Sequence, residues 1–163
     1  MWGSAVGIHH FALVALISLA ITLGVATTGS LFRPDSWYAG LQKPRGTPPP
    51  WVFPVVWTLL YILMAFSAAL VYVHPESPLR LAGLTLYGLQ LLSNALWSWL
   101  FFGRHQILGA LLDLMLLLVL VLACVLVFAL ISPLAAWLLV PYVLWLGVAL
   151  YLNMATYRLN SAS

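Results

Sequence analysis

A stripe of polar and aromatic side chains runs through an otherwise apolar segment of the sequence. Tyr87, Gln90, Asn94 and Trp97 follow one another at spacings of three, four and three positions, so on a helix they share one face. Carboxamides need hydrogen-bond partners where water is excluded, and aromatic rings offer stacking surfaces to flat ligands. The stripe therefore indicates either hydrogen bonds between helices or one wall of a ligand cavity, and both interpretations fit the spacing equally well.

Two further segments carry comparable faces. The first face holds Trp57, Tyr61 and Met64, and the second holds Tyr142, Trp145 and Asn153. Tryptophans near the ends of membrane helices usually anchor the interface, as we expect for Trp37 and Trp51. Trp57 and Trp145 instead fall well inside their apolar segments, where an indole N–H needs a partner. Three such faces can converge on an apolar pocket with few polar groups, which suits a large, flat hydrophobic ligand.

Asp113 is the one acidic residue inside a long apolar run. A carboxylate within a membrane is by default a candidate proton relay or cation site. No second acid or base is expected nearby to complete a relay, so local pairing is the favoured interpretation. His9 and His10 are adjacent and point apart on a helix, and Cys124 lies among Leu and Val. We expect no metal and no cofactor, and no motif of conventional acid–base or nucleophilic catalysis stands out.

The elements that must position these residues are membrane helices. The 163-residue chain is 64% hydrophobic and only 6% charged, so it has too few polar residues to coat a soluble globule. Its charge-free intervals each reach the ~20 residues that cross a bilayer as helix, without the alternation of a transmembrane barrel. We expect a bilayer as partner and no nucleic acid, since the basic residues form no cluster beyond Lys43 and Arg45.

The sequence predicts an all-α integral membrane protein, with a single domain over residues 1–163 and five transmembrane helices. The helices are expected at 8–29, 50–73, 78–102, 105–131 and 133–157, with a long loop over 30–49. Ser77-Pro78 and Ser132-Pro133 each offer a hydroxyl cap followed by proline in the first turn, and Gly103 is expected to end the third helix. Pro141 lies inside the last helix and is expected to kink it.

The basic residues predict an orientation. The end with the long loop would carry Arg33, Lys43, Arg45, Arg104 and Arg158, whereas the opposite end would carry Arg80 alone. Cytoplasmic loops are enriched in Lys and Arg, so we expect loop 30–49 and the C-terminus on the cytoplasmic side. Two small-residue pairs are alternative candidates for a dimer contact: Ala65 with Ala69, and Gly24 with Thr28.

Four stretches in this order resemble the TspO/MBR family of tryptophan-rich sensory and translocator proteins, which includes the peripheral-type benzodiazepine receptor. They are "WYAGLQKPRGTPPPWVFPVVWTLLYILM", "NALWSWLFFG", "GALLDLMLL" and "AAWLLVPYVLWLGVALYLN". The resemblance covers nearly the whole chain and looks most similar to a bacterial member, in a bacterial cell membrane. It implies a five-helix bundle that is usually a homodimer.

The resemblance also implies a ligand pocket between the helices beneath the first loop, which would act as a lid. The lid residues would be Tyr38 and Pro48; the pocket walls would be Trp57, Tyr61, Gln90, Asn94, Trp97, Tyr142 and Trp145. Ligands implied by the family are porphyrins such as protoporphyrin IX, sterols, and synthetic benzodiazepine-type compounds. The prolines of the lid would lower the ordering cost of closing over a ligand.

Several functions follow as hypotheses. The first is a receptor or carrier for porphyrins and related tetrapyrroles, with a sensory role or a light- and oxygen-dependent porphyrin breakdown as variants; we lean against an enzyme. The second is a proton- or cation-coupled transporter that uses Asp113, and a third is a scaffold for membrane complexes. A sterol-binding translocator is a further alternative, but the L/V-x-Y-x-K/R sterol pattern fails here because six residues separate Tyr151 from Arg158.

Overall fold

The computed structural model describes residues 5–32 and 34–161, and every regular element in this part of the chain is helical. Two elements at the N-terminal end are α1 (Ala5–Leu31) and the short α2 (Ser36–Gly40). They are followed by α3 (Val52–Tyr72), α4 (Pro78–Ser98), a π-helical turn η1 (Trp99–Gly103), α5 (Ile107–Ile131) and α6 (Pro133–Asn160). The predicted all-α class is confirmed, and the long helices begin and end within a few residues of the predicted positions.

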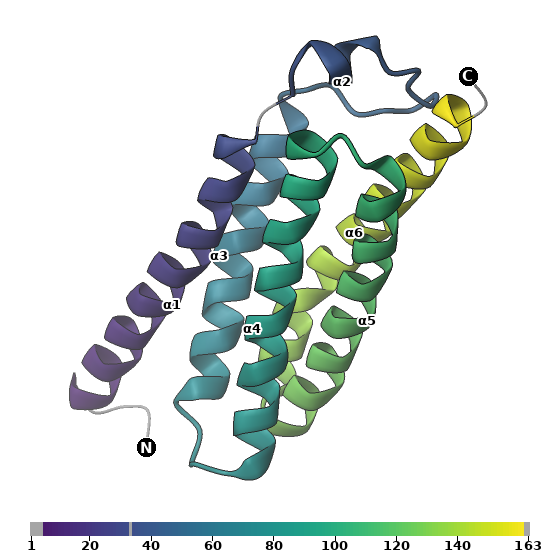
Figure 1. The fold of residues 1–163 in the computed structure, drawn as a ribbon. Coiled ribbons are helices and arrows are strands. Elements are labelled where there is room, and N and C mark those ends of the chain that lie inside the picture. Colours follow the sequence, from purple (N-terminus) through teal and green to yellow (C-terminus); the bar gives the residue numbers. More distant parts are fainter. Residues whose placement is uncertain (1–4, 33, 162–163) are drawn as a thin grey trace.

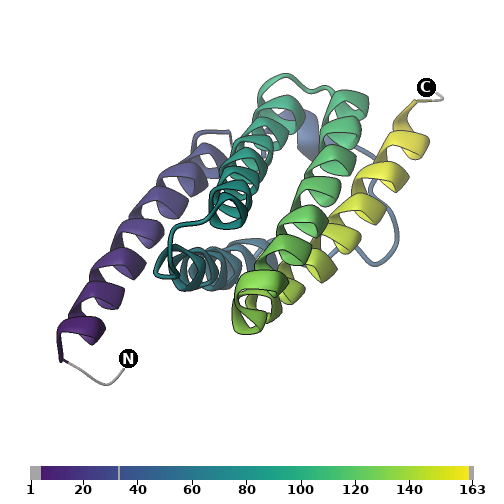
Figure 2. The same ribbon diagram turned by 90° about the horizontal axis from the view of Figure 1, so that it is seen from below.

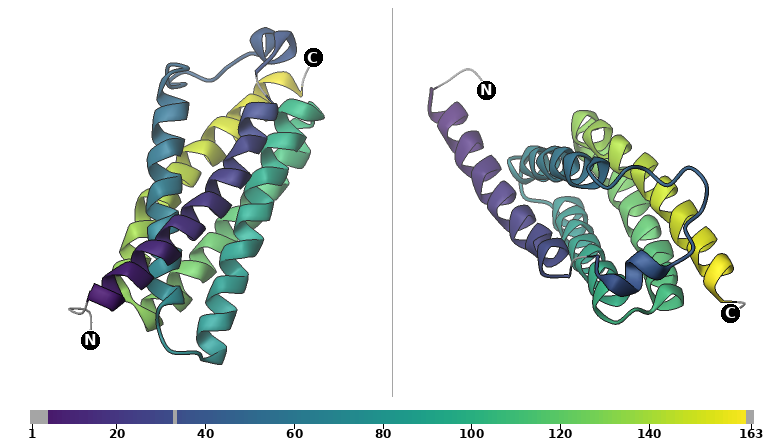
Figure 3. Two further views of the ribbon diagram at one scale, coloured as in Figure 1. Left: turned by 90° about the vertical axis from the view of Figure 1, so that its left-hand side faces the viewer. Right: turned by 90° about the horizontal axis from the view of Figure 1, so that it is seen from above.

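The long helices lie side by side in one bundle, and the segment with α2 crosses one end of it (Figures 1 and 3). Four of them, α1, α3, α5 and α6, are long and apolar enough to cross a membrane. Helix α4 is 21 residues long, but it carries Arg80 and the polar stripe and is not in that set. Seen from below, α1 leans away from the others toward its N-terminal end (Figure 2). Its outward face is apolar, with Leu13, Leu16 and Ile17 exposed.

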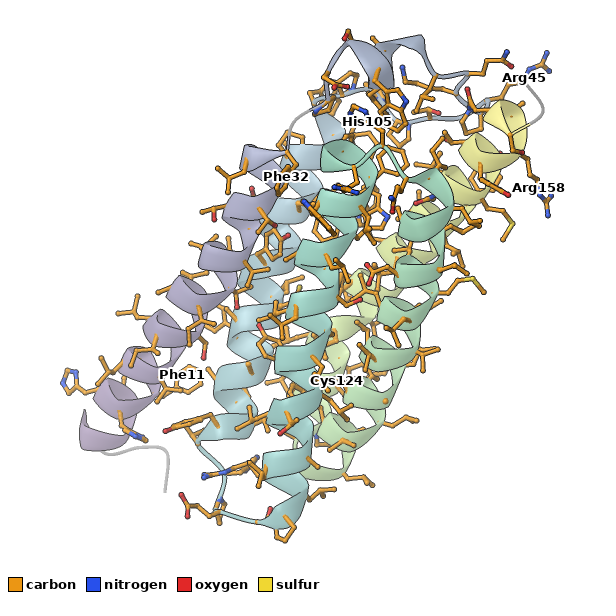
Figure 4. All side chains as sticks on the ribbon, viewed as in Figure 1. Phe11, Phe32, Arg45, His105, Cys124 and Arg158 are labelled. Atoms are coloured by element: carbon orange, nitrogen blue, oxygen red, sulfur yellow. The ribbon has the colours of Figure 1, made fainter. Side chains whose placement is uncertain are left out.

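The core lies where α3, α4, α5 and α6 meet. Met64, Leu114, Leu117, Phe128 and Tyr142 are among the largest fully buried side chains. Cys124 is buried in the same cluster, as the sequence predicts, and Figure 4 places it inside the bundle. Helix α4 adds Tyr87 and Leu91 to this core, so four helices pack together and fix the positions of the faces that carry polar residues.

The hydroxyl caps are where the sequence predicts them. Ser77 Oγ accepts from the backbone N–H of Arg80 at 3.1 Å, and Ser132 Oγ accepts from that of Ala135 at 3.4 Å. Each serine is followed by a proline whose missing N–H is not needed in the first turn. Pro141 lies within α6, which continues as one helix past it.

Two local details differ from the predictions. The loop over 30–49 is interrupted by α2, which Asp35 caps by accepting from the N–H of Tyr38 at 3.1 Å. The third predicted helix does end at Gly103, but its last residues form the π-helical turn η1, and a left-handed backbone conformation follows two residues later at His105, with φ 57°. Gly103 is instead required for space, since a Cβ on it would lie 2.9 Å from Cδ1 of Phe32.

Candidate functional site

A chain of hydrogen bonds joins α3, α4 and α6 at the centre of the bundle. Tyr61 Oη donates to Asn94 Oδ1 at 2.9 Å, and Asn94 Nδ2 donates to Tyr142 Oη at 3.1 Å. Tyr142 Oη in turn donates to Gln90 Oε1 at 3.1 Å. We call these four residues the central network. All four are buried, so every polar atom in it needs a partner from the protein or from a ligand.

The direction of these bonds leaves one end of the central network unpaired. Each tyrosine hydroxyl donates its single proton to the next acceptor, so the donor-to-acceptor direction runs from Tyr61 to Gln90. Gln90 Oε1 accepts from Tyr142, whereas Gln90 Nε2 is buried and has no hydrogen-bond partner. An unpaired buried amide costs roughly 1–3 kcal/mol. Gln90 therefore offers two free N–H donors to any acceptor atom that reaches it.

Aromatic rings flank the central network. Trp57 stacks on Tyr61 with ring centroids 5.4 Å apart, and it meets Tyr142 edge-on at 6.1 Å. Trp145 is half-buried, and its ring contacts Phe53 of α3 with centroids 5.8 Å apart. The structure thus brings Trp57, Tyr61 and Tyr142 together and places Trp145 at their side.

Trp97 belongs to a second polar contact, nearer the lid. Its Nε1 donates to Asn153 Oδ1 at 3.0 Å, and Asn153 Nδ2 donates to the carbonyl of Ile107 at 3.0 Å. The Trp97 ring also stacks on Phe101 of η1 at 5.4 Å. The hydrogen bond to the indole explains why a carboxamide is buried on α6.

The segment predicted to act as a lid, for which we keep that name, contacts η1, the link between η1 and α5, and α6 through its residues 34–49. Tyr38 contacts the rings of Phe101 and Phe102 at 6.1 and 5.4 Å, and Lys43 Nζ lies 4.4 Å from the centre of the Tyr38 ring. Partial burial raises the pKa of the Tyr38 hydroxyl above its ordinary value. Pro48 is half-buried in the same segment. Figure 3 shows the lid passing across the helix ends from above.

The second half of the lid is tied to α6. Asn160 Oδ1 accepts from the N–H of Gln42 at 3.0 Å, and its Nδ2 donates to the carbonyl of the same residue at 3.0 Å. Tyr151 Oη also reaches the carbonyl of Arg45 at 3.5 Å. Sequence reasoning missed Asn160 and Gln42, because a carboxamide that pairs with loop backbone has no signature in the spacing of either residue.

Asp113 faces α4 within the bundle. Its Oδ1 accepts from Ser93 Oγ at 3.0 Å, whereas its Oδ2 is buried without a partner. The predicted local pairing is therefore present for one oxygen of the carboxyl group. Tyr87, the first residue of the predicted stripe on α4, does not join the central network. It faces α1 and shares a 2.8 Å hydrogen bond with Thr22.

The central network is closed in this conformation. A hollow of about 490 Å³ lies between the start of α5 and the end of α6, lined by His105, Leu112, Tyr157 and Asn160 among others. A second hollow of about 240 Å³ lies between α1, α3 and α4 and includes Tyr72 and Tyr87. Neither hollow is lined by Trp57, Asn94 or Tyr142. A ligand at the central network must therefore separate side chains that now bond to one another.

Comparison of the sequence with known proteins identifies its relatives. The sequence model of the TspO/MBR family matches residues 13–158. Protein CrtK of Rhodobacter capsulatus is 43% identical over 82% of this chain and 84% of its own length. The tryptophan-rich sensory protein of Cereibacter sphaeroides is 41% identical over 89% of this chain and 90% of its own, and the human translocator protein is 40% identical over 76% and 75%.

Proposed function

Since the chain belongs to the TspO/MBR family of multi-pass membrane proteins, we propose that it is a receptor or carrier for porphyrins and other flat hydrophobic ligands. The ligand lies between α3, α4 and α6, beneath the lid. The observation that carries the proposal is the unpaired Gln90 amide, buried at the end of a hydrogen-bonded chain whose two tyrosines contact Trp57.

The chemistry of these groups selects the ligand class. A porphyrin presents a flat ring to the faces of Trp57 and Tyr61, and its carboxylates are acceptors for the free N–H groups of Gln90. Asn94 and Tyr142 orient the ring from the same side, and Trp97 and Trp145 extend the wall. Tyr38 and Pro48 close the site from the lid. The rings and donors supply binding and orientation, and the donor set offers no acid–base pair for catalysis.

Binding requires the closed network to open. The Tyr61–Asn94 and Asn94–Tyr142 bonds must lengthen or break as the ligand enters, and each is worth roughly 0.5–1.5 kcal/mol net. A porphyrin gains roughly 25 cal/mol for each Å² of apolar surface that it removes from water. Burial of its two large faces therefore outweighs the cost of breaking these two hydrogen bonds.

Quenching of tryptophan fluorescence by protoporphyrin IX tests the pocket. Trp57→Phe combined with Trp145→Phe is expected to weaken quenching, whereas Asp113→Asn leaves it nearly unchanged. If Asp113→Asn weakened quenching and the double tryptophan variant did not, the ligand pocket would not lie between α3, α4 and α6. Absence of saturable binding to the purified protein would favour a scaffold for membrane complexes instead.

A second variant tests the role of Gln90. Gln90→Met keeps the shape of the side chain and removes its amide, so protoporphyrin IX affinity should fall roughly 10-fold to 100-fold, as expected for a lost hydrogen bond to a charged group. Octaethylporphyrin has no carboxylate and serves as the matched ligand, whose affinity should change little. Equal losses for both porphyrins would mean that Gln90 only supports the fold.

We propose that α4 is the fifth membrane-spanning helix. Its polar stripe faces the bundle through Gln90, Ser93 and Asn94, so its low hydropathy does not expose those groups to lipid. The lid and the C-terminus then lie on one side, in the cytoplasm of a bacterial cell, where Arg45 and Arg158 point outward at the same end of the bundle (Figure 4). Tagging each end and testing its accessibility from outside the cell checks this orientation.

We also propose a homodimer. Ala65 and Ala69 are buried within the chain, whereas Gly24 is exposed and a Cβ there would meet no atom within 4 Å. The pair Gly24 and Thr28 is therefore the small-residue pair available to a second copy. Gly24→Leu should reduce the dimer fraction measured by light scattering in detergent, and Gly147→Leu is the exposed-glycine control.

One observation favours a second candidate function. Asp113 Oδ2 is buried without a partner, as a proton or cation site would be before loading. A transporter coupled through Asp113 predicts substrate-dependent proton uptake into vesicles that Asp113→Asn abolishes. Porphyrin binding that survives this substitution, without any proton movement in the wild-type protein, favours the receptor.

A further inference from the structure

Helix α2 and its cap contact η1 and the short link that joins η1 to α5. Asp35, which caps α2 through its Oδ1, places Oδ2 at 3.1 Å from Nε2 of His105. Trp37, in the first turn of the helix, stacks on the His105 imidazole with centroids 4.2 Å apart and planes 14° from parallel. The same indole meets Phe101 edge-on at 5.8 Å. One histidine thus contacts both the cap and the first turn of α2.

The backbone of His105 is strained in a way that produces this contact. Its φ of 57° is the one positive value for a residue other than glycine in the described part of the chain. The π-helical turn before it sets this geometry, because Arg104 N–H donates to Trp99 O at 2.8 Å and Gln106 N–H donates to Leu100 O at 2.9 Å. Strained residues and π-helical turns concentrate at functional sites. Figure 4 shows His105 directly below the lid.

We propose that His105, Asp35 and Trp37 form a proton-operated latch that holds α2 against the bundle most tightly when the imidazole is protonated. The consequence for ligand release rests on the proposed function of the pocket, whereas the latch itself is a property of the ligand-free protein. A protonated imidazole turns the hydrogen bond to Asp35 into an ion pair and adds a cation–π contact with the Trp37 ring.

The charges around His105 leave Asp35 as its acidic partner. Arg104 lies 5.6 Å from the centre of the Trp99 ring, and Lys43 lies over the Tyr38 ring. Tyr157 and Asn160 of α6 lie across the hollow that His105 also lines, next to Arg158. Arg33 falls outside the described residues. The other two acidic residues, Glu76 and Asp113, lie at the far turn and inside the bundle.

The sign of the pH effect follows from these charges. The backbone N–H of Tyr38 has the largest effect on the Asp35 carboxyl and lowers its pKa; desolvation opposes this, and the smaller effect of the His105 charge lowers the pKa further, so the net pKa is below its ordinary value. The Asp35 carboxylate therefore keeps its charge to a lower pH than an ordinary aspartate does. Histidine side chains generally gain their proton between pH 8 and 5. The latch should tighten over that interval and weaken again only when the Asp35 carboxylate is protonated at lower pH.

Hydrogen–deuterium exchange of the ligand-free, full-length protein in nanodiscs tests the latch. The protection of residues 36–41, corrected for intrinsic exchange rates, should be roughly twofold to fivefold higher at pH 5.5 than at pH 8.0, the range an exposed ion pair allows. His105→Asn removes the imidazole but tolerates the left-handed backbone, and Asp35→Asn removes the charge but keeps a good helix cap. Both variants should lose the pH dependence.

The controls separate the latch from other effects. His74→Gln, at the opposite end of the bundle, should retain the wild-type pH dependence. Equal protection at the two pH values in the wild-type protein, or unchanged pH dependence in both latch variants, overturns the proposal. Stopped-flow release of protoporphyrin IX should also be slower at pH 5.5 than at pH 8.0. If no porphyrin binds but exchange still depends on pH through His105, the latch stands and the proposed ligand fails.

Discussion

Asn94 and Tyr142, 48 positions apart in the sequence, are joined by a 3.1 Å hydrogen bond from the Asn94 amide to the tyrosine hydroxyl at the centre of the bundle. Because Asn94 also accepts from Tyr61, one carboxamide connects α3, α4 and α6. The same side chains that are proposed to hold a ligand therefore also connect three helices of the bundle.

Asn94→Ala should destabilise the ligand-free protein. The substitution removes the acceptor of Tyr61 and the donor to Tyr142, and both hydroxyls are buried. We expect a loss of about 1–3 kcal/mol in the free energy of unfolding, measured by denaturation in detergent micelles. Thr58→Ala is the matched control, since its hydroxyl bonds only to Pro54 of its own helix on an exposed face. Equal stability of the two variants would contradict a structural role for the central network.

Trp97→Phe should separate stacking from hydrogen bonding at the second polar contact. Phenylalanine keeps a ring against Phe101, but it leaves Asn153 Oδ1 without the indole donor now 3.0 Å away. The expected cost is again about 1–3 kcal/mol in unfolding free energy. Trp51→Phe changes an exposed indole and should stay within about 0.5 kcal/mol of wild type. An unaffected Trp97→Phe protein would show that Asn153 finds another donor.

Gly103→Ala should disturb the end of α1 where it meets η1. An added methyl group would lie 2.9 Å from Phe32 and 3.1 Å from Trp99, so one of these rings must move. We expect a loss of about 1–3 kcal/mol in unfolding free energy, as for other overpacked sites. Gly147→Ala provides the comparison, because a Cβ there meets no atom within 4 Å. Similar melting temperatures for the two proteins would argue against the close approach.

Asn160→Ala should loosen the second half of the lid without affecting the latch. Gln42 would lose the partners of both its N–H and its carbonyl, now each at 3.0 Å. Exchange of the Gln42 amide should become roughly twofold to tenfold faster, the range expected for one lost hydrogen bond. Asn160→Asp keeps an acceptor for that amide and should retain most of its protection. Faster exchange of residues 36–41 in Asn160→Ala would instead mean that the lid moves as one unit.

The sequence by itself determined the helical class, the approximate ends of the long helices and the family. Apolar runs long enough to cross a bilayer, and the serine–proline caps, are local properties, so they can be read from neighbouring residues. The shared face of Gln90 and Asn94 was also predictable, because helical periodicity alone places side chains on a face.

Only the tertiary structure decided what those faces contact. Spacing placed Tyr87 in line with Gln90, Asn94 and Trp97, yet Tyr87 bonds to α1 and Trp97 to Asn153, because each turn of α4 meets a different neighbour. The latch at His105 was equally beyond the sequence. It depends on the π-helical turn η1 and the left-handed backbone of His105. Together they bring His105 next to Asp35, which lies 70 positions earlier in the chain. Contacts between distant segments arise from the way helices pack, and residue spacing within one segment does not encode them.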